Sequence, residues 1–462
     1  MTIGIVGNGI IGLMAAYAIS ARQPNVPVAV IGRKSRVGCA SLAAAAMFNS
    51  FCEIEVGTLS NSIERQRFLF NKQSNSRWPG LLEQLRSESS QLIHGGFGTF
   101  LIKNATTDWL EDNNFDAICA ALAEFGEPHQ EASAADIAHY KPSAAGRATR
   151  AIFIPNEGWV NPVHLLSALD SILSRRKNVT FIDDHAHRIL TSSGKVTGIA
   201  LEQGDPVSAE QAIVCNGAEF TALMQRSGLD ALFQRVFYGV GATALLECGE
   251  HATKNCIRTP NRGLACGLYS APQTATEVVI GASNFISPVP EKEARLTSVF
   301  TLLKSAMEQI NADYYRARLL RVNVGWRPTS SDTLPLIGPT SVAGLLIATG
   351  TRRDGLHCSP VIADYLTDMI LAGTSAQDMR LYAPERPLTR LYSREEAIEK
   401  YVTHTINAMY QHGFTPPQGR TLEDIRQHYR NEFSALHEQI GAKDWGIPID
   451  MRDMYKYGHI TP

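Results

Sequence analysis

The chain has 462 residues, too many for one ordinary hydrophobic core, so its length predicts at least two domains. It is 44% hydrophobic and carries 43 Lys and Arg against 45 Asp and Glu, a formal net charge of −2. This balance is typical of a soluble globular protein and gives no indication of a nucleic-acid or anionic-membrane partner.

No apolar run reaches transmembrane length, and the first expected strand leaves no room for a signal peptide, so we expect a cytoplasmic protein. The eight cysteines are scattered, with neither a Cys-x-x-Cys pair nor the Cys/His spacing of a zinc site. We therefore expect reduced thiols and no bound metal.

A glycine-rich turn opens the chain, with the sequence Gly7-Asn8-Gly9-Ile10-Ile11-Gly12. An apolar run at 3–6 precedes it and a helix-like apolar run at 13–19 follows it. In such a strand–turn–helix unit, backbone N–H groups and a helix N-terminus face a pyrophosphate. The pattern predicts that Gly7, Gly9, Ile10, Ile11 and Gly12 bind a dinucleotide, the alternative being an ordinary βαβ turn.

The end of the next expected strand, 28–31, departs from this fingerprint. An acidic residue normally binds a ribose hydroxyl there, but this chain has Gly32-Arg33-Lys34. A basic strand end suggests a ribose 2′-phosphate, which makes NADP an alternative to FAD. A run of small residues follows at 38–47, which either packs as an alanine helix or lets a flat ligand approach the backbone.

The following segments predict alternating helices and strands. We expect a long helix at 61–90, a helix near 115–125, a strand at 151–155, a helix at 162–173, a strand at 179–182, a hairpin at 188–201 and a strand from 212 that ends in the turn Asn216-Gly217. Residues 233–324 read mostly as strands (241–246, 264–269, 277–282) with one helix at 291–310. A strand at 345–350 and a helix at 359–371 follow. In the charged tail, Thr421 with Asp424 resembles an N-cap box and Gly441 a C-cap for a helix at 422–440.

Two later segments carry a family resemblance. Residues 325–338 (GWRPTSSDTLPLIG) and 350–355 (GTRRDG) resemble signatures of the D-amino-acid oxidase family, nearest its glycine oxidase and sarcosine oxidase branch. The small-residue run that ends at 45–47 and the turn at 159–162 are also similar to that branch. The resemblance covers about residues 1–380.

The resemblance implies an α/β fold (α+β overall) with two domains. The first is a discontinuous Rossmann-like FAD-binding domain, residues 1–85, 146–225 and 325–384. The second is an antiparallel-sheet substrate-binding domain, residues 86–145 and 226–324. Beyond the resemblance, we expect residues 385–462 to form a helical C-terminal extension, which has no counterpart in short glycine-oxidase-like chains.

The resemblance also implies non-covalent FAD and an enzyme that oxidises the C–N bond of an amino acid or amine by hydride transfer, giving an imine. Covalent attachment through Cys39 or Cys358 is an alternative. Besides the residues of the turn and of positions 32–34, the expected cofactor-binding residues are Ser41, Ala45, Ala46, Met47, Asn216, Gly217, Gly350, Arg353, Asp354, Gly355 and Leu356.

Arg327 is the expected anchor of the substrate carboxylate, because the planar guanidinium matches a carboxylate bidentately. Its alternative role is a structural ion pair, and Arg353 is a second candidate. The family's carboxylate-binding tyrosine falls at Gly267, so Tyr269 or Tyr238 is expected to replace it. The lysine that promotes the oxygen reaction in sarcosine oxidases is replaced by Val279, which predicts another electron acceptor.

The tail carries five of the thirteen histidines, and none is close enough in sequence to another to predict a metal site. We expect the tail to pack on the substrate domain as a lid or as the interface of a homo-oligomer. The other expected partner is a small amino-acid or amine substrate. Two other functions stay open at this point: an NADPH-dependent reductase or monooxygenase that uses Arg33 and Lys34, and a flavoprotein subunit of a larger complex.

Overall fold

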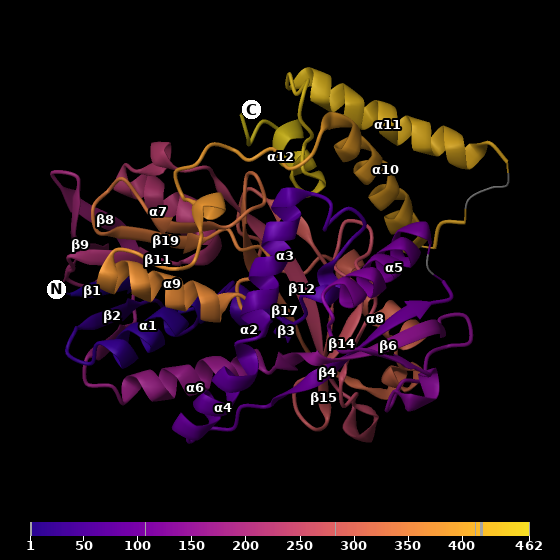
Figure 1. Ribbon diagram of the computed structural model, residues 1–462, viewed down its shortest axis with the longest axis horizontal. Helices are drawn as coiled ribbons and strands as arrows, with labels where there is room; N and C mark the ends of the chain where they lie inside the picture. The colour runs from indigo at the N-terminus through magenta and orange to yellow at the C-terminus, as the bar shows by residue number, and fades with distance from the viewer. Residues whose placement is uncertain (1, 107, 282, 412, 416–418, 462) are drawn as a thin grey trace.

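The computed structural model describes residues 2–461 except 107, 282, 412 and 416–418 (Figure 1). Its first sheet has the strand order β18-β19-β11-β1-β2-β7, and all of it is parallel except β18. The strands are β1 (Ile3–Val6), β2 (Val28–Ile31), β7 (Val179–Ile182), β11 (Gln211–Val214), β18 (Leu336–Pro339) and β19 (Leu345–Thr349). The four residues of β1 and of β2 are all buried, as expected for a parallel sheet that is covered on both faces.

Helices pack on one face of this sheet and a small second sheet covers the other. The helices are α1 (Ile10–Arg22), α6 (Pro162–Ser174) and α9 (Ser359–Ala372), which share one core with β1 and β2. The opposite core is closed by α7 (Phe220–Ser227), β8 (Ala186–Ser192), β9 (Lys195–Leu201) and β10 (Val207–Ser208). This arrangement confirms the expected Rossmann-like unit with its hairpin.

A larger, mainly antiparallel sheet stands beside the first, with the order β16-β12-β15-β14-β13-β4-β6-β3, while β17 pairs with β12 and β5 with β6. Its strands are β3 (Met47–Phe48), β4 (Gly95–Asn104), β5 (Gln130–Ala132), β6 (Ala148–Val160), β12 (Val236–Glu247), β13 (Cys256–Arg258), β14 (Tyr269–Pro272), β15 (Glu277–Gly281), β16 (Phe285–Ser287) and β17 (Arg318–Ser330). The helices α5 (Trp109–Glu124) and α8 (Leu296–Gln309) accompany it. The expected α/β fold with an additional antiparallel sheet is thus confirmed.

Two strands of the large sheet extend into segments that the prediction assigns to the nucleotide domain. Strand β6 belongs to the large sheet, although the sequence places 146–225 in the nucleotide domain, and β17 runs without a break through the boundary at 325. Periodicity identifies a strand but not the sheet that it joins, because its partner, here β4 or β12, is distant in sequence.

Several predicted elements also change. The long helix at 61–90 is two helices, α3 (Ser62–Asn75) and α4 (Trp78–Glu88), with Pro79 in the first turn of α4. The strand at 264–269 is wrong: Leu264 has φ of +59° and β14 begins only at Tyr269. The predicted N-cap box is wrong as well, because the N-cap of α11 (Thr421–Gln439) is Arg420, without a side-chain hydrogen bond.

The C-terminal extension is an integral part of this structure. Helices α10 (Arg394–Gln411), α11 and α12 (Arg452–Lys456) share a core with Phe237 of β12 and Ile286 of β16. In Figure 1 the yellow extension lies across the large sheet, above α3 and α5. The rings of Tyr401 and Phe433 stack with their centroids 4.3 Å apart and join α10 to α11. The extension therefore packs on the large sheet, as the lid hypothesis requires.

Candidate active site

The glycine turn between β1 and α1 forms a cradle that only glycine permits. A Cβ at Gly7 (φ of +116°) would lie 2.4 Å from the carbonyl oxygen of Cys215, and one at Gly12 would lie 1.9 Å from that of Gly7. Helix α1 has Gly9 as its N-cap and no side-chain cap, while the Ile10 N–H donates to the Ser41 hydroxyl at 3.1 Å. The N-terminus of α1 is therefore shaped to receive an anionic group.

This cradle opens into a cavity of about 660 Å³. Most of the predicted residues line it: Gly7, Gly9, Ile10, Ile11, Gly32, Arg33, Ser41, Ala45, Ala46, Met47, Asn216, Gly217, Tyr269, Arg327, Arg353, Asp354, Gly355 and Leu356. The buried Asn216 Oδ1 has no hydrogen-bond partner among the described residues. An uncapped helix, close-packed glycines and an unpaired buried acceptor together fit an extended dinucleotide.

Four predicted residues lie outside this lining. Gly12 lets α1 pack closely against the turn after β1, where a Cβ would collide with the Gly7 oxygen. Gly350 (φ of +71°) lies in the turn after β19. The backbone N–H of Lys34 donates to Asp183 at 2.8 Å. Tyr238 packs edge-on against Trp326, with ring centroids 5.6 Å apart. Of the two tyrosines expected at the substrate, Tyr269 lines the cavity and Tyr238 does not.

Asn8, in the glycine turn, fills the position of the missing ribose-binding acid. A Cβ on Gly32 would lie 2.6 Å from Cγ of Asn8, whose Nδ2 donates to the backbone oxygen of Arg33 at 3.0 Å. The Arg33 side chain pairs with Glu202 at 2.9 Å on the surface. Asn8 therefore occupies the space that an acidic side chain at position 32 would need.

Arg327 is a half-buried guanidinium in β17, at the wall of this cavity. Its Nη1 donates to the Ser283 backbone oxygen and to Asn284 Oδ1, both at 3.0 Å. No carboxylate pairs with it in the described part of the chain. Burial lowers the pKa of Arg327, and the neighbouring Arg353 lowers it further. A partly desolvated cation without a counter-ion is a favourable place for a ligand carboxylate.

Tyr269 stands next to this cation. Its ring lies over Gly281, where a Cβ would fall 1.9 Å from the phenol oxygen. Burial raises the pKa of Tyr269 well above its usual range, so the phenol stays protonated and can donate a hydrogen bond. Val279 is buried in the apolar cluster that contains Tyr269 and Cys266.

A chain of buried charges, which the sequence analysis missed, connects this wall to its surroundings. Glu53 accepts from the fully buried Arg258 at 2.8 Å and lies 3.7 Å from Arg353. Burial alone would raise the pKa of Glu53, but the charges of Arg258 and Arg353 lower it. The only sequence signal was Glu53 and Glu55 within an otherwise apolar stretch, a pattern that suggests buried, paired charges.

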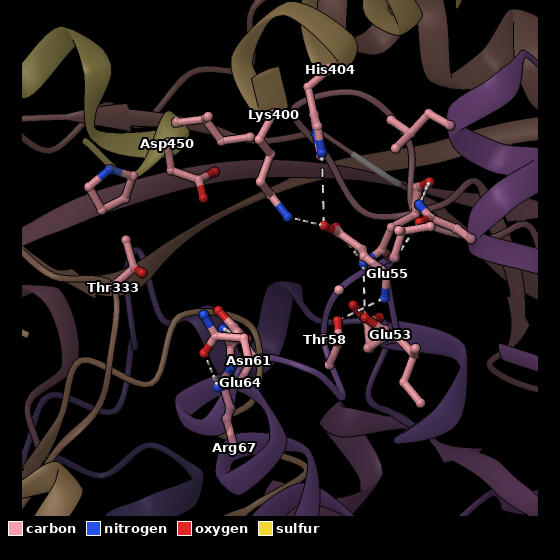
Figure 2. Close-up of a pocket in the computed structure, with 18 of the residues that line it drawn as sticks. Glu53, Glu55, Thr58, Asn61, Glu64, Arg67, Thr333, Lys400, His404 and Asp450 are labelled. Atoms are coloured by element: carbon pink, nitrogen blue, oxygen red, sulfur yellow. Dashed lines mark hydrogen bonds and ion pairs between the residues drawn. The ribbon is translucent and has the colours of Figure 1, made fainter. Parts of the chain in front are cut away.

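A second chamber of about 690 Å³ adjoins the first, and the extension forms one side of it (Figure 2). Four residues line both cavities: Glu53, Arg352, Arg353 and Asp354. The carboxylates of the second chamber are Glu53, Glu55, Glu64, Asp354, Glu396, Glu399 and Asp450, and its cationic side chains are Arg67, Arg352, Arg353 and Lys400.

Lys400 and His404 of α10 both face Glu55 (Figure 2). Lys400 Nζ lies 2.5 Å from Glu55 Oε2, and His404 Nε2 lies 3.9 Å from it. Burial lowers the pKa of His404 to about 4, so this histidine is neutral at pH 7 and forms no true salt bridge. The Leu264 N–H donates to His404 Nδ1 at 3.3 Å, which leaves the proton on Nε2, towards Glu55.

The described residues contain no group of three or more His, Cys, Asp or Glu that could hold a metal ion. The buried His437 is held within the extension instead, by the Phe433 oxygen at 2.7 Å and the Ile447 N–H at 3.0 Å. Among the described residues no helix is both long and apolar enough to cross a membrane.

Comparison with known proteins identifies the family and the cofactor. The family of FAD dependent oxidoreductases, abbreviated DAO, matches residues 2–369. The chain belongs to this family. It is a flavoprotein oxidoreductase, so the expected cofactor, FAD, is confirmed.

Two curated relatives illustrate the likeness. Glycine oxidase of Pseudomonas putida is 25% identical over 283 residues, covering 60% of this chain and 73% of its own. The bifunctional protein ThiO/ThiG of Nostoc sp. is 22% identical over 418 residues, covering 89% of this chain. The matched region spans only 58% of that longer protein.

Solved structures show the same fold. Glycine oxidase from Geobacillus kaustophilus has a TM-score of 0.70 at 22% identity, covering 84% of this chain and 99% of its own. Iminodiacetate oxidase from Chelativorans sp. BNC1 has a TM-score of 0.69 at 18% identity, covering 83% and 100%.

Proposed function

We propose that the protein oxidises the C–N bond of an amino acid or a carboxylate-bearing amine with FAD. The observation that carries this proposal is Arg327, a half-buried cation at the wall of the first cavity, which we assign to FAD, without a carboxylate partner in the described chain. The names of two relatives, glycine oxidase and iminodiacetate oxidase, support a substrate of this class.

Bound FAD supplies the redox chemistry by accepting a hydride from the substrate carbon next to nitrogen. The amine loses a proton, the C–N single bond becomes a C=N double bond, and water hydrolyses the imine. Arg327 binds the substrate carboxylate through its free N–H groups, and the protonated Tyr269 donates to the same carboxylate. These contacts fix the carbon against the cofactor and exclude water from it.

We propose that FAD is held without a covalent bond. Cys358 is buried, and its thiol donates to Asn71 Oδ1 at 3.0 Å. Burial raises the pKa of the Cys358 thiol, which keeps it from forming a nucleophilic thiolate. Cys39 lines the cavity at the small-residue run. Acid precipitation tests this proposal: FAD should appear in the supernatant, and a yellow pellet would contradict it.

The substrate proposal is tested with the purified yellow protein under anaerobic conditions. Glycine, sarcosine, iminodiacetate and both enantiomers of larger amino acids should bleach the flavin where they are substrates. Arg327→Leu should lower kcat/KM roughly 100-fold for a carboxylate substrate. The matched control is Arg321→Leu, an exposed arginine on the same strand, which should change little. Equal kinetics for Arg327→Leu and wild type would refute the carboxylate role.

A further inference from the structure

The chamber beneath the extension adjoins the first cavity. Arg353 and Asp354 line both spaces, so the second chamber begins at residues that also border the space next to Arg327. The second chamber is as large as the first, at about 690 Å³. A substrate as small as glycine would leave it unused, so its size and position fit the distal part of a longer substrate.

The cationic side chains of this chamber are already paired. Arg67 donates to Asp354 at 2.9 Å, Lys400 lies 2.5 Å from Glu55, and Arg353 lies 3.7 Å from Glu53. Arg352 forms a close pair with Asp450. The chamber therefore offers no uncompensated cation among its described residues, and an anionic distal group would find no counter-ion there.

Glu64 is the carboxylate of this chamber whose charge is only weakly balanced by a cation. Glu396 and Glu399 are exposed on α10, and Glu399 pairs with Arg430 at 2.5 Å. Glu64 on α3 is 17% exposed and lies 3.7 Å from Arg67, whose two shorter contacts are both to Asp354. Figure 2 shows Glu64 across the chamber from Lys400 and Asp450.

Tyr392 and Ser50 add polar groups to the chamber that contains Glu64. Tyr392, from the extension, donates its hydroxyl to Glu64 Oε1 at 3.2 Å, which orients the carboxylate. Ser50 also lines the chamber; it is 2% exposed, and its hydroxyl has no hydrogen-bond partner among the described residues. A buried unpaired hydroxyl in the same chamber as a weakly paired carboxylate is suited to a ligand that carries N–H donors.

We infer that the second chamber binds a cationic distal group of the substrate, with Glu64 as the recognising carboxylate. The substrate is then a basic amino acid or a secondary amine derived from one, with its carboxylate at Arg327 and an ammonium or guanidinium group at Glu64. This inference rests on the proposed function. The extension completes the specificity site, because Tyr392 and Lys400 fix the arrangement of its acidic groups.

The test compares isosteres that differ only in the distal charge. The probes are lysine against norleucine and ornithine against norvaline, as both enantiomers and as their Nα-methyl derivatives. Anaerobic flavin reduction by the holoenzyme gives kcat/KM for each. We expect the basic member of a pair to be roughly 10- to 100-fold better, mainly through KM, since Glu64 lies away from the reacting carbon.

Glu64→Gln isolates the charge, because glutamine keeps an acceptor for Tyr392 at the same size. It should abolish the preference for the basic member, whereas Glu83→Gln, an exposed change on α4, should preserve it. Wild-type reduction by norleucine as efficient as by lysine overturns the inference, whether or not the variant folds. Reduction by glycine or sarcosine but by no basic probe overturns the inference alone. Failure of every amine to reduce the flavin overturns the proposed function as well.

Discussion

The guanidinium of Arg327 lies flat against the Cα of Gly241 on the neighbouring strand. A Cβ added at Gly241 would fall 2.2 Å from Nη2 and 2.3 Å from Cζ of Arg327. The two residues lie on β17 and β12, which are paired in register through Gly241 and Gly325. The glycine therefore sets the height of the cation above the sheet, and with it the position of the proposed carboxylate anchor.

Gly241→Ala should displace this guanidinium while the cofactor cradle stays intact. We expect kcat/KM for a carboxylate substrate to fall on the order of 10- to 100-fold, because displacing a positioning group by about 1 Å has this effect. FAD content, from the absorbance spectrum, should be unchanged. Gly80→Ala is the control, since a Cβ there meets nothing within 4 Å. Full activity of Gly241→Ala would mean that the arginine's position does not limit catalysis.

The contact between Asn8 and Gly32 predicts how this chain tolerates the usual ribose-binding acid. Gly32→Glu alone should weaken FAD binding roughly tenfold, because the new side chain collides with Asn8. The double change Asn8→Gly with Gly32→Glu should restore binding by making room for the carboxylate. Fluorescence titration of the apoprotein with FAD measures both. Tighter binding by the single variant would show that Asn8 does not block this site.

The buried His404 predicts a loss of stability in mild acid. In the unfolded chain it binds a proton below about pH 6.5, but in the folded protein only below about 4. Protons therefore favour the unfolded chain as the pH falls from about 6.5 to 4, by at most about 3 kcal/mol, and this group has no effect above that window.

His404→Asn removes this titration and keeps an acceptor for the Leu264 N–H. Its unfolding temperature should fall less than that of wild type between pH 6.5 and 4. Glu55, Lys400, Asp450 and Arg353 surround the histidine, so the comparison must be a difference between the two proteins at each pH. Parallel curves would contradict the neutral, buried state of His404.

The packing of the extension predicts that it unfolds together with the rest of the protein. Phe433 is 1% exposed, so Phe433→Ala should lower the free energy of unfolding by about 3–5 kcal/mol. A single, shifted thermal transition and reduced turnover are expected, whereas Tyr457→Ala, at an exposed residue, should be neutral. A separate early transition with intact turnover would show that the extension is an independent appendage. Light scattering of the same samples tests the predicted homo-oligomer.

The apolar surroundings of Val279 predict a slow reaction of the reduced enzyme with oxygen. Electron transfer to oxygen develops negative charge, which a nearby cation would stabilise and a buried valine does not. After anaerobic reduction, mixing with a dye acceptor should reoxidise the protein faster than mixing with air-saturated buffer. Reoxidation by oxygen as fast as turnover would make the protein a true oxidase.

Sequence alone determined those features of the protein that can be recognised from residues close together in the chain. The turn at Gly7–Gly12 was recognised from a strand–turn–helix pattern within a few residues, and the 325–338 and 350–355 segments identified both the FAD fold and Arg327. These features could be read because each depends on neighbours in the chain.

Only the tertiary structure brought together the charges of the second chamber. Glu64 meets Tyr392, and Glu55 meets Lys400, across more than 300 residues of sequence. Local sequence signals predicted a helix at 422–440 in the extension, but they did not show that Phe237 would pack against the extension. A buried charge is tolerated only where a partner compensates it, and which partner is available depends on long-range packing that no local pattern encodes.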